Sequence, residues 1–151
     1  MKNLLSCILT VLLAISCQTQ PANHAEKSQI HTDSLRRLIL TQQAAWNRGD
    51  IEGFMQGYHN DTGMQFITRK GVRYGWQATL DSYRKHYPTK DSMGRLEFGL
   101  QKVEFLDEGM ETGHIAGTWK LYRHADTPSG YFSLITRKVG TAHKIIIDHT
   151  W

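Results

Sequence analysis

The stretch QQAAWNRGDIEGFMQGY, residues 42–58, decides how the rest of the chain is arranged. It has the pattern of a helix end, a tight corner and a second helix start. Gly49 suits the left-handed position just past a helix. Asp50 suits the N-cap of the next helix, where its carboxylate accepts backbone N–H bonds. Large apolar side chains on both sides of the corner point toward one partner: Trp46, Ile51, Phe54, Met55 and Tyr58. We infer that this partner is a curved sheet formed by the second half of the chain.

Helical patterns extend on both sides of the corner. The first helix is expected to begin at Thr32 or Asp33, either of which can serve as a cap. A short hairpin with a turn at 69–71 follows the second helix. The third helix is expected from Trp76 to Tyr87, because Pro88 disfavours helical backbone before it.

Four strands with short connections follow, which together with the helices predicts an α+β domain. In the first of them the apolar alternation changes parity between Leu100 and Val103, so we expect a β-bulge there. In the last strand Ile145, Ile147 and His149 share one face, and Ile146, Asp148 and Thr150 share the other.

Composition is that of one ordinary globular domain, with 151 residues, 40% hydrophobic and 21% charged. The net charge is +4, and it falls to +3 (17 basic and 14 acidic residues) if Lys2 is removed with a leader. The basic pairs Arg36-Arg37 and Arg84-Lys85 are short and lie on polar helix faces. We therefore expect no nucleic-acid partner.

The N-terminus is typical of a secretory leader, because Lys2 precedes an apolar run too short to cross a bilayer. The sequence LAISC (13–17) resembles the bacterial lipobox, which implies a lipoprotein signal peptide over 1–16 and lipidation of Cys17. Cys7 would leave with the leader, so the mature chain could form no internal disulfide. The alternative is ordinary cleavage nearby, which would release a soluble protein.

The lipobox resemblance implies a bacterial cell-envelope location, with the membrane as partner through Cys17 and the domain facing periplasm or exterior. Residues 17–31 are small, polar and aperiodic, which predicts a flexible tether. The domain itself would occupy 32–151.

The order of elements resembles the nuclear transport factor 2-like superfamily. Five stretches resemble its SnoaL-like branch of unassigned function: AWNRGD (45–50), GW through YP (75–88), GTWKL (117–121), SGYFSL (129–134) and IDHT (147–150). The resemblance implies a cystatin-like cone, in which a strongly bent antiparallel sheet wraps three N-terminal helices and a pocket opens at the wide end. His143 and Trp151 depart from the family pattern. The superfamily includes ketosteroid isomerases, polyketide cyclases, dehydratases and members that only bind or oligomerise.

His149 is the first candidate for a catalytic group, because its parity turns it inward with Ile145 and Ile147. The alternative is a core histidine that is hydrogen-bonded to a helix. Arg123 either meets an anionic ligand at the rim or reaches solvent from a strand end. Ligand-binding aromatic candidates, which could equally be core residues, are Trp46, Tyr58, Trp76, Tyr83 and Trp119.

No metal-binding or phosphate-binding motif occurs, so we expect no metal and no cofactor. Two hypotheses remain. The first is a lipid-anchored module that binds a small hydrophobic ligand or a protein, with a homodimer through the outer sheet face as one form. The second is a cofactor-independent lyase or isomerase of a small carbonyl compound. The second predicts an enclosed pocket with at least two inward polar groups, His149 among them.

Overall fold

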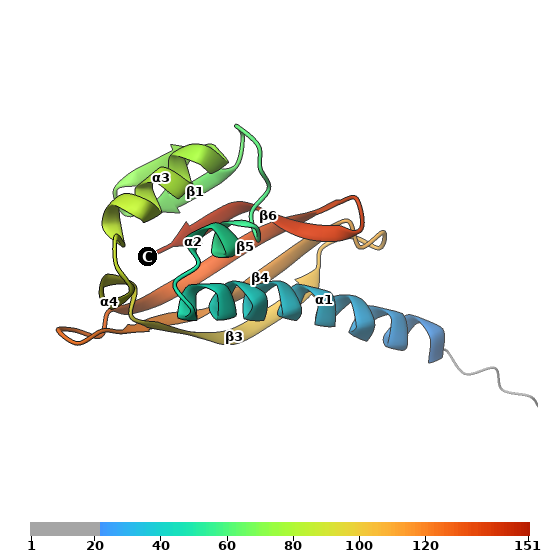
Figure 1. Ribbon diagram of the computed structural model, residues 1–151. Helices are drawn as coiled ribbons and strands as arrows, with labels where there is room; N and C mark the ends of the chain where they lie inside the picture. Colours follow the sequence, from blue (N-terminus) through green and yellow to red (C-terminus); the bar gives the residue numbers. More distant parts are fainter. Residues whose placement is uncertain (1–21) are drawn as a thin grey trace, which may run out of the picture.

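The computed structural model describes residues 22–151, which form helices packed on a single sheet (Figure 1). The helices are α1 (Ala22–Asn47), α2 (Ile51–Met55), α3 (Trp76–His86) and α4 (Lys90–Met93). The strands are β1 (Gln65–Thr68), β2 (Gly71–Tyr74), β3 (Arg95–Phe105), β4 (Thr112–Tyr122), β5 (Ser129–Val139) and β6 (Ala142–Thr150).

The sheet has the strand order β2-β1-β6-β5-β4-β3, and α1 lies along its long strands (Figure 1). The predicted α+β class and bent sheet are confirmed. Two details differ from the prediction. The pair β1–β6 is parallel, so the sheet is mixed, and a fourth, short helix α4 follows α3. The parallel pair arises because the β1–β2 hairpin joins the sheet beside the last strand of the chain.

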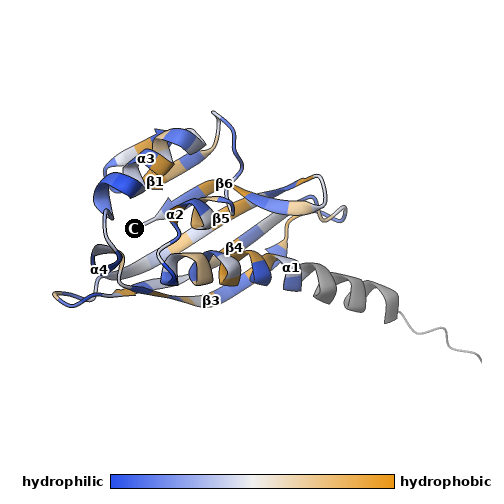
Figure 2. Ribbon diagram, viewed as in Figure 1, coloured by the Kyte–Doolittle hydropathy of each residue, from blue (hydrophilic) through white to orange (hydrophobic). Residues whose placement is uncertain are grey.

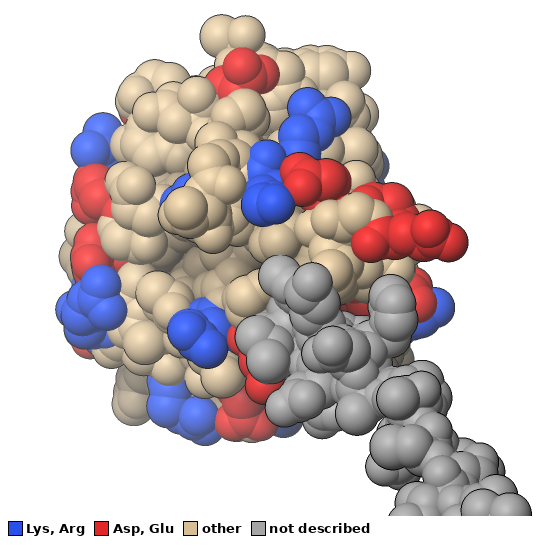
Figure 3. Space-filling model, turned by 90° about the vertical axis from the view of Figure 1, so that its right-hand side faces the viewer, with Lys and Arg blue, Asp and Glu red and all other residues tan. Residues whose placement is uncertain are grey.

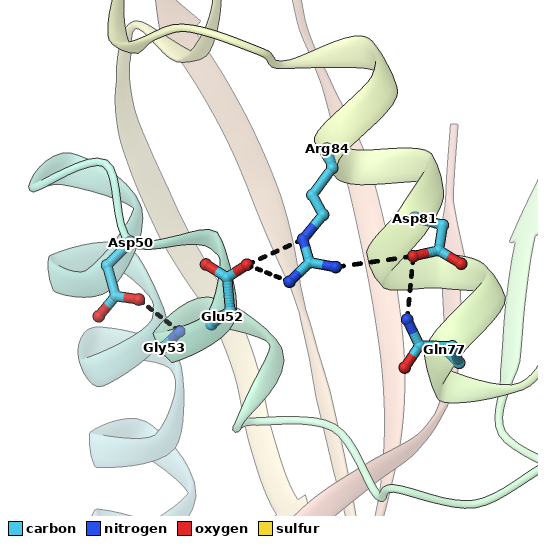
Figure 4. Close-up of polar contacts among 6 residues, drawn as sticks. All are labelled: Asp50, Glu52, Gly53, Gln77, Asp81 and Arg84. Atoms are coloured by element: carbon cyan, nitrogen blue, oxygen red, sulfur yellow. Dashed lines mark hydrogen bonds and ion pairs between the residues drawn. The ribbon is translucent and has the colours of Figure 1, made fainter.

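The predicted corner between α1 and α2 is confirmed. Gly49 has φ +85°, and the Asp50 carboxylate accepts a 2.6 Å hydrogen bond from the Gly53 N–H. Arg84 of α3 then donates to Glu52 of α2 at 2.6 Å, which links the two helices (Figure 4). The corner is therefore held by a cap within α2 and by an ion pair to α3.

The edge strand β3 is tied to α1 by two amide side chains of the helix. Asn47 accepts from the Leu96 N–H at 2.7 Å and donates to the Leu96 carbonyl at 2.9 Å. Gln43 accepts from the Phe98 N–H at 2.7 Å. These bonds occupy backbone groups that an open edge would leave unpaired.

Two irregularities bend the long strands. The predicted bulge in β3 is confirmed, because the pairing with β4 shifts between Leu100 and Lys102. A second shift lies between β5 and β6, where Ile135 pairs with Ile147 and Thr136 with Ile145. Ile146 is thus an extra residue, and it inverts the facing of every later residue of β6.

The core lies between α1, α2, α3 and the inner sheet face. Hydrophobic residues, coloured orange in Figure 2, occur on these helices and on the strands that they cover. Fully buried members include Leu35, Ile39, Met55, Met64, Ile115 and Ile145. On the end of the molecule from which α1 projects, basic and acidic side chains are interspersed (Figure 3).

Helix α1 begins at Ala22, within the segment that was expected to be a tether. The predicted leader, residues 1–16, and the predicted lipidation site, Cys17, lie outside the described residues. Within residues 22–151, no helix combines the length and the apolar character needed to cross a membrane.

Candidate functional site

A cavity of about 480 Å³ lies between the helices and the inner face of the sheet. Its walls are mainly aromatic and aliphatic: Trp46, Phe54, Phe66, Tyr87, Leu96, Phe98, Trp119, Leu121, Phe132 and Leu134. The long strands supply one wall, and α1, α2, α3 and the β1–β2 hairpin supply the others. This size and this predominance of apolar walls are typical of small-molecule sites.

One carboxylate lies in this lining, at Asp148 of β6. Asp148 is 4% exposed, and its Oδ2 accepts a 2.6 Å hydrogen bond from the Tyr58 hydroxyl. Its Oδ1 accepts a 2.6 Å hydrogen bond from the Thr150 hydroxyl. Tyr58 is the last residue of the stretch 42–58, and an isolated β-bridge to Ile145 holds it beside β6. Both carboxylate oxygens therefore have partners from the protein itself.

Burial sets the protonation chemistry of this group. Burial raises the pKa of Asp148 above its ordinary value of 3.8, and the hydrogen bonds from Thr150 and Tyr58 oppose that rise. Burial, and then the charge of Asp148, raises the pKa of the Tyr58 hydroxyl well above its usual range. The same two causes raise the pKa of Tyr83 well above its usual range. Both phenols therefore remain neutral donors at physiological pH.

Aromatic rings form the helical side of the cavity. Trp46 meets Phe54, Tyr83 and Tyr87 edge-on, at ring-centroid distances of 5.2, 5.8 and 4.8 Å. Its indole nitrogen donates to the Met93 carbonyl at 3.1 Å, which orients the ring. On the sheet side, the Nε1 of Trp119 is buried and has no hydrogen-bond partner among the described residues. A buried indole N–H without an acceptor costs free energy, and this nitrogen lies over Gly130 of the neighbouring strand.

A group of basic side chains lines the cavity on the side of the β1–β2 hairpin. Arg69 and Lys70 form the hairpin turn, and Arg73 lies on β2. The strand pairing places Arg73 opposite Phe66, and Phe66 opposite Asp148, so these three residues form one row across the inner face. The row runs from a buried carboxylate through an aromatic ring to a guanidinium.

The inward orientation predicted for His149 is wrong. The extra residue at Ile146 inverts the parity, so Asp148 faces the cavity, whereas His149 is exposed and packs against the Trp151 ring at 4.7 Å. Asp148 lies on the face opposite Ile147, as the alternation predicts. Only the choice of inner face at this end of the strand was inverted.

The other predicted residues divide into two groups. Trp46, Tyr58, Tyr83 and Trp119 line the cavity, as their candidate role requires. Trp76 lies outside the lining and donates its indole N–H to the Met55 carbonyl at 2.8 Å, so its contact is structural. Arg123 also lies outside the lining, where it forms a two-point ion pair with Asp126 at 2.6 Å.

Sequence reasoning missed Asp148, Arg73 and Phe66 as cavity residues. The signal for Arg73 was the alternation within the β1–β2 hairpin, which places Arg73 on the face opposite Val72 and Tyr74. Within residues 32–151, no three His, Cys, Asp or Glu side chains gather in a way that could hold a metal ion.

Comparison with solved structures gives proteins of the same fold. A protein of unknown function from Shewanella oneidensis MR-1, described as NTF-2 like, is 37% identical and superposes with a TM-score of 0.75, covering 79% of this chain and 97% of its own. A Nostoc punctiforme domain of unknown function with a cystatin-like fold is 18% identical, with a TM-score of 0.64 over 87% of this chain and 78% of its own.

A ketosteroid isomerase-like protein from Erwinia carotovora atroseptica shares the fold at 12% identity, with a TM-score of 0.62 over 80% of this chain and 94% of its own. Protein-family models and curated proteins give no match to this chain. The Shewanella relative combines sequence identity with nearly full coverage of its own length. The chain therefore belongs to the nuclear transport factor 2-like family.

Proposed function

We propose that this domain binds a small hydrophobic ligand in the cavity between α1, α2, α3 and the inner sheet face. The observation that carries the proposal is the cavity itself, about 480 Å³ in volume, with mainly apolar walls and a few convergent polar groups. A ligand body buried against Phe98, Leu121 and Phe132 would gain about 25 cal/mol for each Å² of apolar surface removed from water.

The proposal is tested with N-phenyl-1-naphthylamine, a neutral fluorophore that becomes bright in apolar sites. The purified protein is expected to bind about one molecule saturably. Leu134→Phe adds volume inside the cavity and should weaken binding, whereas Leu106→Phe adds the same volume at a site that is 54% exposed and should not. Absence of saturable binding, or equal binding by both variants, would contradict the proposal. Native mass spectrometry of the protein as purified identifies any ligand that is already bound.

A cofactor-independent lyase or isomerase of a small carbonyl compound is the second candidate. The observation that favours it is Asp148, a buried carboxyl with a raised pKa beside the phenols of Tyr58 and Tyr83. In its ionised form such a group can accept a proton from a carbon next to a carbonyl. Ligand binding is preferred because both oxygens of Asp148 already accept hydrogen bonds from the protein.

Solvent-deuterium exchange next to the carbonyl of small ketones, followed by NMR, distinguishes the two functions. An enzyme would accelerate exchange above the buffer rate and lose that acceleration in Asp148→Asn. A binding module would leave exchange at the buffer rate in both proteins.

We also propose that Cys17 carries a lipid that holds the domain at the bacterial cell envelope, facing periplasm or exterior. The support is the sequence of residues 2–17, with its charged start, short apolar run and lipobox-like end. Intact-mass measurement should give a lipid-modified Cys17 at the N-terminus, and Cys17→Ala should move the protein from the membrane fraction. An unmodified N-terminus elsewhere would contradict this assignment.

A role as an interaction module, including a homodimer through the outer sheet face, remains a further proposal. Its support is an exposed aromatic pair at the end of the sheet, where Tyr131 (52% exposed) stacks on Trp151 (40% exposed). Sedimentation velocity of the protein and of Tyr131→Ser tests it. A dimer that the substitution dissociates is expected, and a monomer at all concentrations would contradict it.

A further inference from the structure

We propose that the ligand is an amphipathic carboxylate, such as a medium-chain fatty acid, with its anionic head held by Arg69, Lys70 and Arg73 and its chain in the cavity. The inference rests on the proposed function, because it specifies the ligand of the same cavity. For brevity, these three residues are called the basic rim.

The cavity lining carries an excess of positive charge. The basic rim supplies three permanent cations to the lining, and the only carboxylate among the lining residues is Asp148. Within residues 32–151, no acidic side chain lies within ion-pair distance of any of the three cations. By contrast, two arginines outside the lining are already paired, since Arg84 binds Glu52 and Arg123 binds Asp126. The rim therefore offers charge that an anion can complement.

The basic rim lies on the hairpin side of the cavity, away from Asp148. Arg69 and Lys70 are exposed at the turn of the hairpin, while Arg73 is half-buried with its guanidinium 5.9 Å from the Phe66 ring centroid. Adjacent strands lie about 4.8 Å apart, so Arg73 and Asp148 are separated by roughly 10 Å of backbone spacing with Phe66 between them. A carboxylate can meet the rim while the apolar chain passes Phe66 toward Leu134, and solvent remains accessible to the head.

The opposite orientation, with the anionic head beside Asp148, is unfavourable. Asp148 already accepts hydrogen bonds from Tyr58 and Thr150. When Asp148 is ionised, its carboxylate has no hydrogen to donate, so an anionic head beside it would find no donor there. Like charges in a poorly solvated site repel strongly. A cationic head fares no better at the rim, where three positive charges lie. The arrangement thus selects an anion at the hairpin and a neutral chain in the interior.

Ligands of equal chain length separate this inference from the proposed function. Displacement of N-phenyl-1-naphthylamine is measured with decanoate, decanol and decylamine, all below their micelle concentrations. Decanoate should bind about tenfold tighter than decanol, and decylamine should bind weakest. Added salt should weaken decanoate binding and leave decanol binding nearly unchanged. Decyl phosphate distinguishes a carboxylate preference from a general anion preference, and it should bind no tighter than decanoate.

Variants locate the head group. Arg73→Gln should weaken decanoate binding about tenfold and Arg69→Gln about threefold, with decanol affinity unchanged in both. Arg36→Gln removes the same charge from an exposed position on α1, outside the lining, and should change neither affinity. Arg73→Lys should retain most of the decanoate affinity, and thermal melts check that each variant is folded.

Each outcome has one meaning. Binding of decanol and decylamine as tightly as decanoate overturns the amphipathic-carboxylate inference and leaves the proposed function standing. Equal loss in Arg36→Gln and Arg73→Gln overturns the assignment to the basic rim. Tighter binding of decyl phosphate overturns the carboxylate preference. Absence of binding by all of these ligands and by the fluorophore overturns both proposals.

Discussion

Removing the Tyr58 hydroxyl tests the polar centre of the cavity most sharply. In Tyr58→Phe the Oδ2 of buried Asp148 loses its 2.6 Å donor, and no described residue other than Thr150 hydrogen-bonds that carboxylate. A hydrogen bond to a charged group contributes about 1.5–3 kcal/mol, and the orphaned acceptor keeps its desolvation penalty. We therefore expect a loss of about 2 kcal/mol in the free energy of unfolding at a pH where Asp148 is ionised. With a urea m-value of about 2 kcal/mol/M, the unfolding midpoint should fall by about 1 M.

The stability cost of Tyr58→Phe should depend on pH, and the raised pKa of Asp148 sets the direction of that dependence. Because the pKa of Asp148 is raised in the folded state, its neutral form favours folding below 3.8, and that contribution is lost as pH rises through the folded pKa. The Tyr58 hydrogen bond holds this pKa down, so Tyr58→Phe should raise it further. The cost of the substitution should consequently grow from pH 4 to pH 8. In an Asp148→Asn background the cost should fall to about 1 kcal/mol and lose its pH dependence.

Tyr131→Phe is the matched control, because Tyr131 is 52% exposed and should change stability by less than about 0.5 kcal/mol. Two results would refute the reasoning: a Tyr58→Phe cost no larger than that of the control, or a cost that grows on acidification.

Two further predictions concern packing around α1. Asn47→Ala should lower the free energy of unfolding in urea by about 2 kcal/mol, because it removes both hydrogen bonds to Leu96 and exposes the edge of β3. Asn60→Ala, at an exposed site, should be nearly neutral. Equal effects of the two substitutions would contradict the tie between α1 and β3. Gly57→Ala should cost about 1–3 kcal/mol, because the new Cβ would lie 2.6 Å from the buried Gln42 side chain; an unchanged melting temperature would show that Gln42 can move aside.

Local chemistry predicted the corner between α1 and α2 and the bulge in β3. At the corner, Gly49 is the residue type favoured in left-handed backbone just past a helix, and Asp50 is a type favoured at an N-cap. In β3 the apolar residues alternate with polar ones, so an extra residue changes the visible parity between Leu100 and Val103. Each feature is encoded within a few adjacent residues.

The bulge in β6 could not be predicted in the same way. It lies within Ile145-Ile146-Ile147, three identical apolar residues, so an extra residue there leaves no mark on the alternation. Because this extra residue is not visible in the alternation, the sequence predicted His149 as the inward residue, whereas Asp148 faces the cavity in the structure. The parallel pairing of β1 with β6 was also hidden, because it joins segments about 80 residues apart through backbone hydrogen bonds that no local pattern encodes.

The position of the ligand itself tests the central claim most directly. A crystal of the protein soaked with 10-bromodecanoic acid yields the bromine position from its anomalous signal. The account predicts bromine inside the cavity near Phe98 and Phe132, with the carboxylate at Arg69, Lys70 or Arg73. Bromine on the outer sheet face, or a carboxylate placed beside Asp148 with the chain directed to solvent, would contradict it.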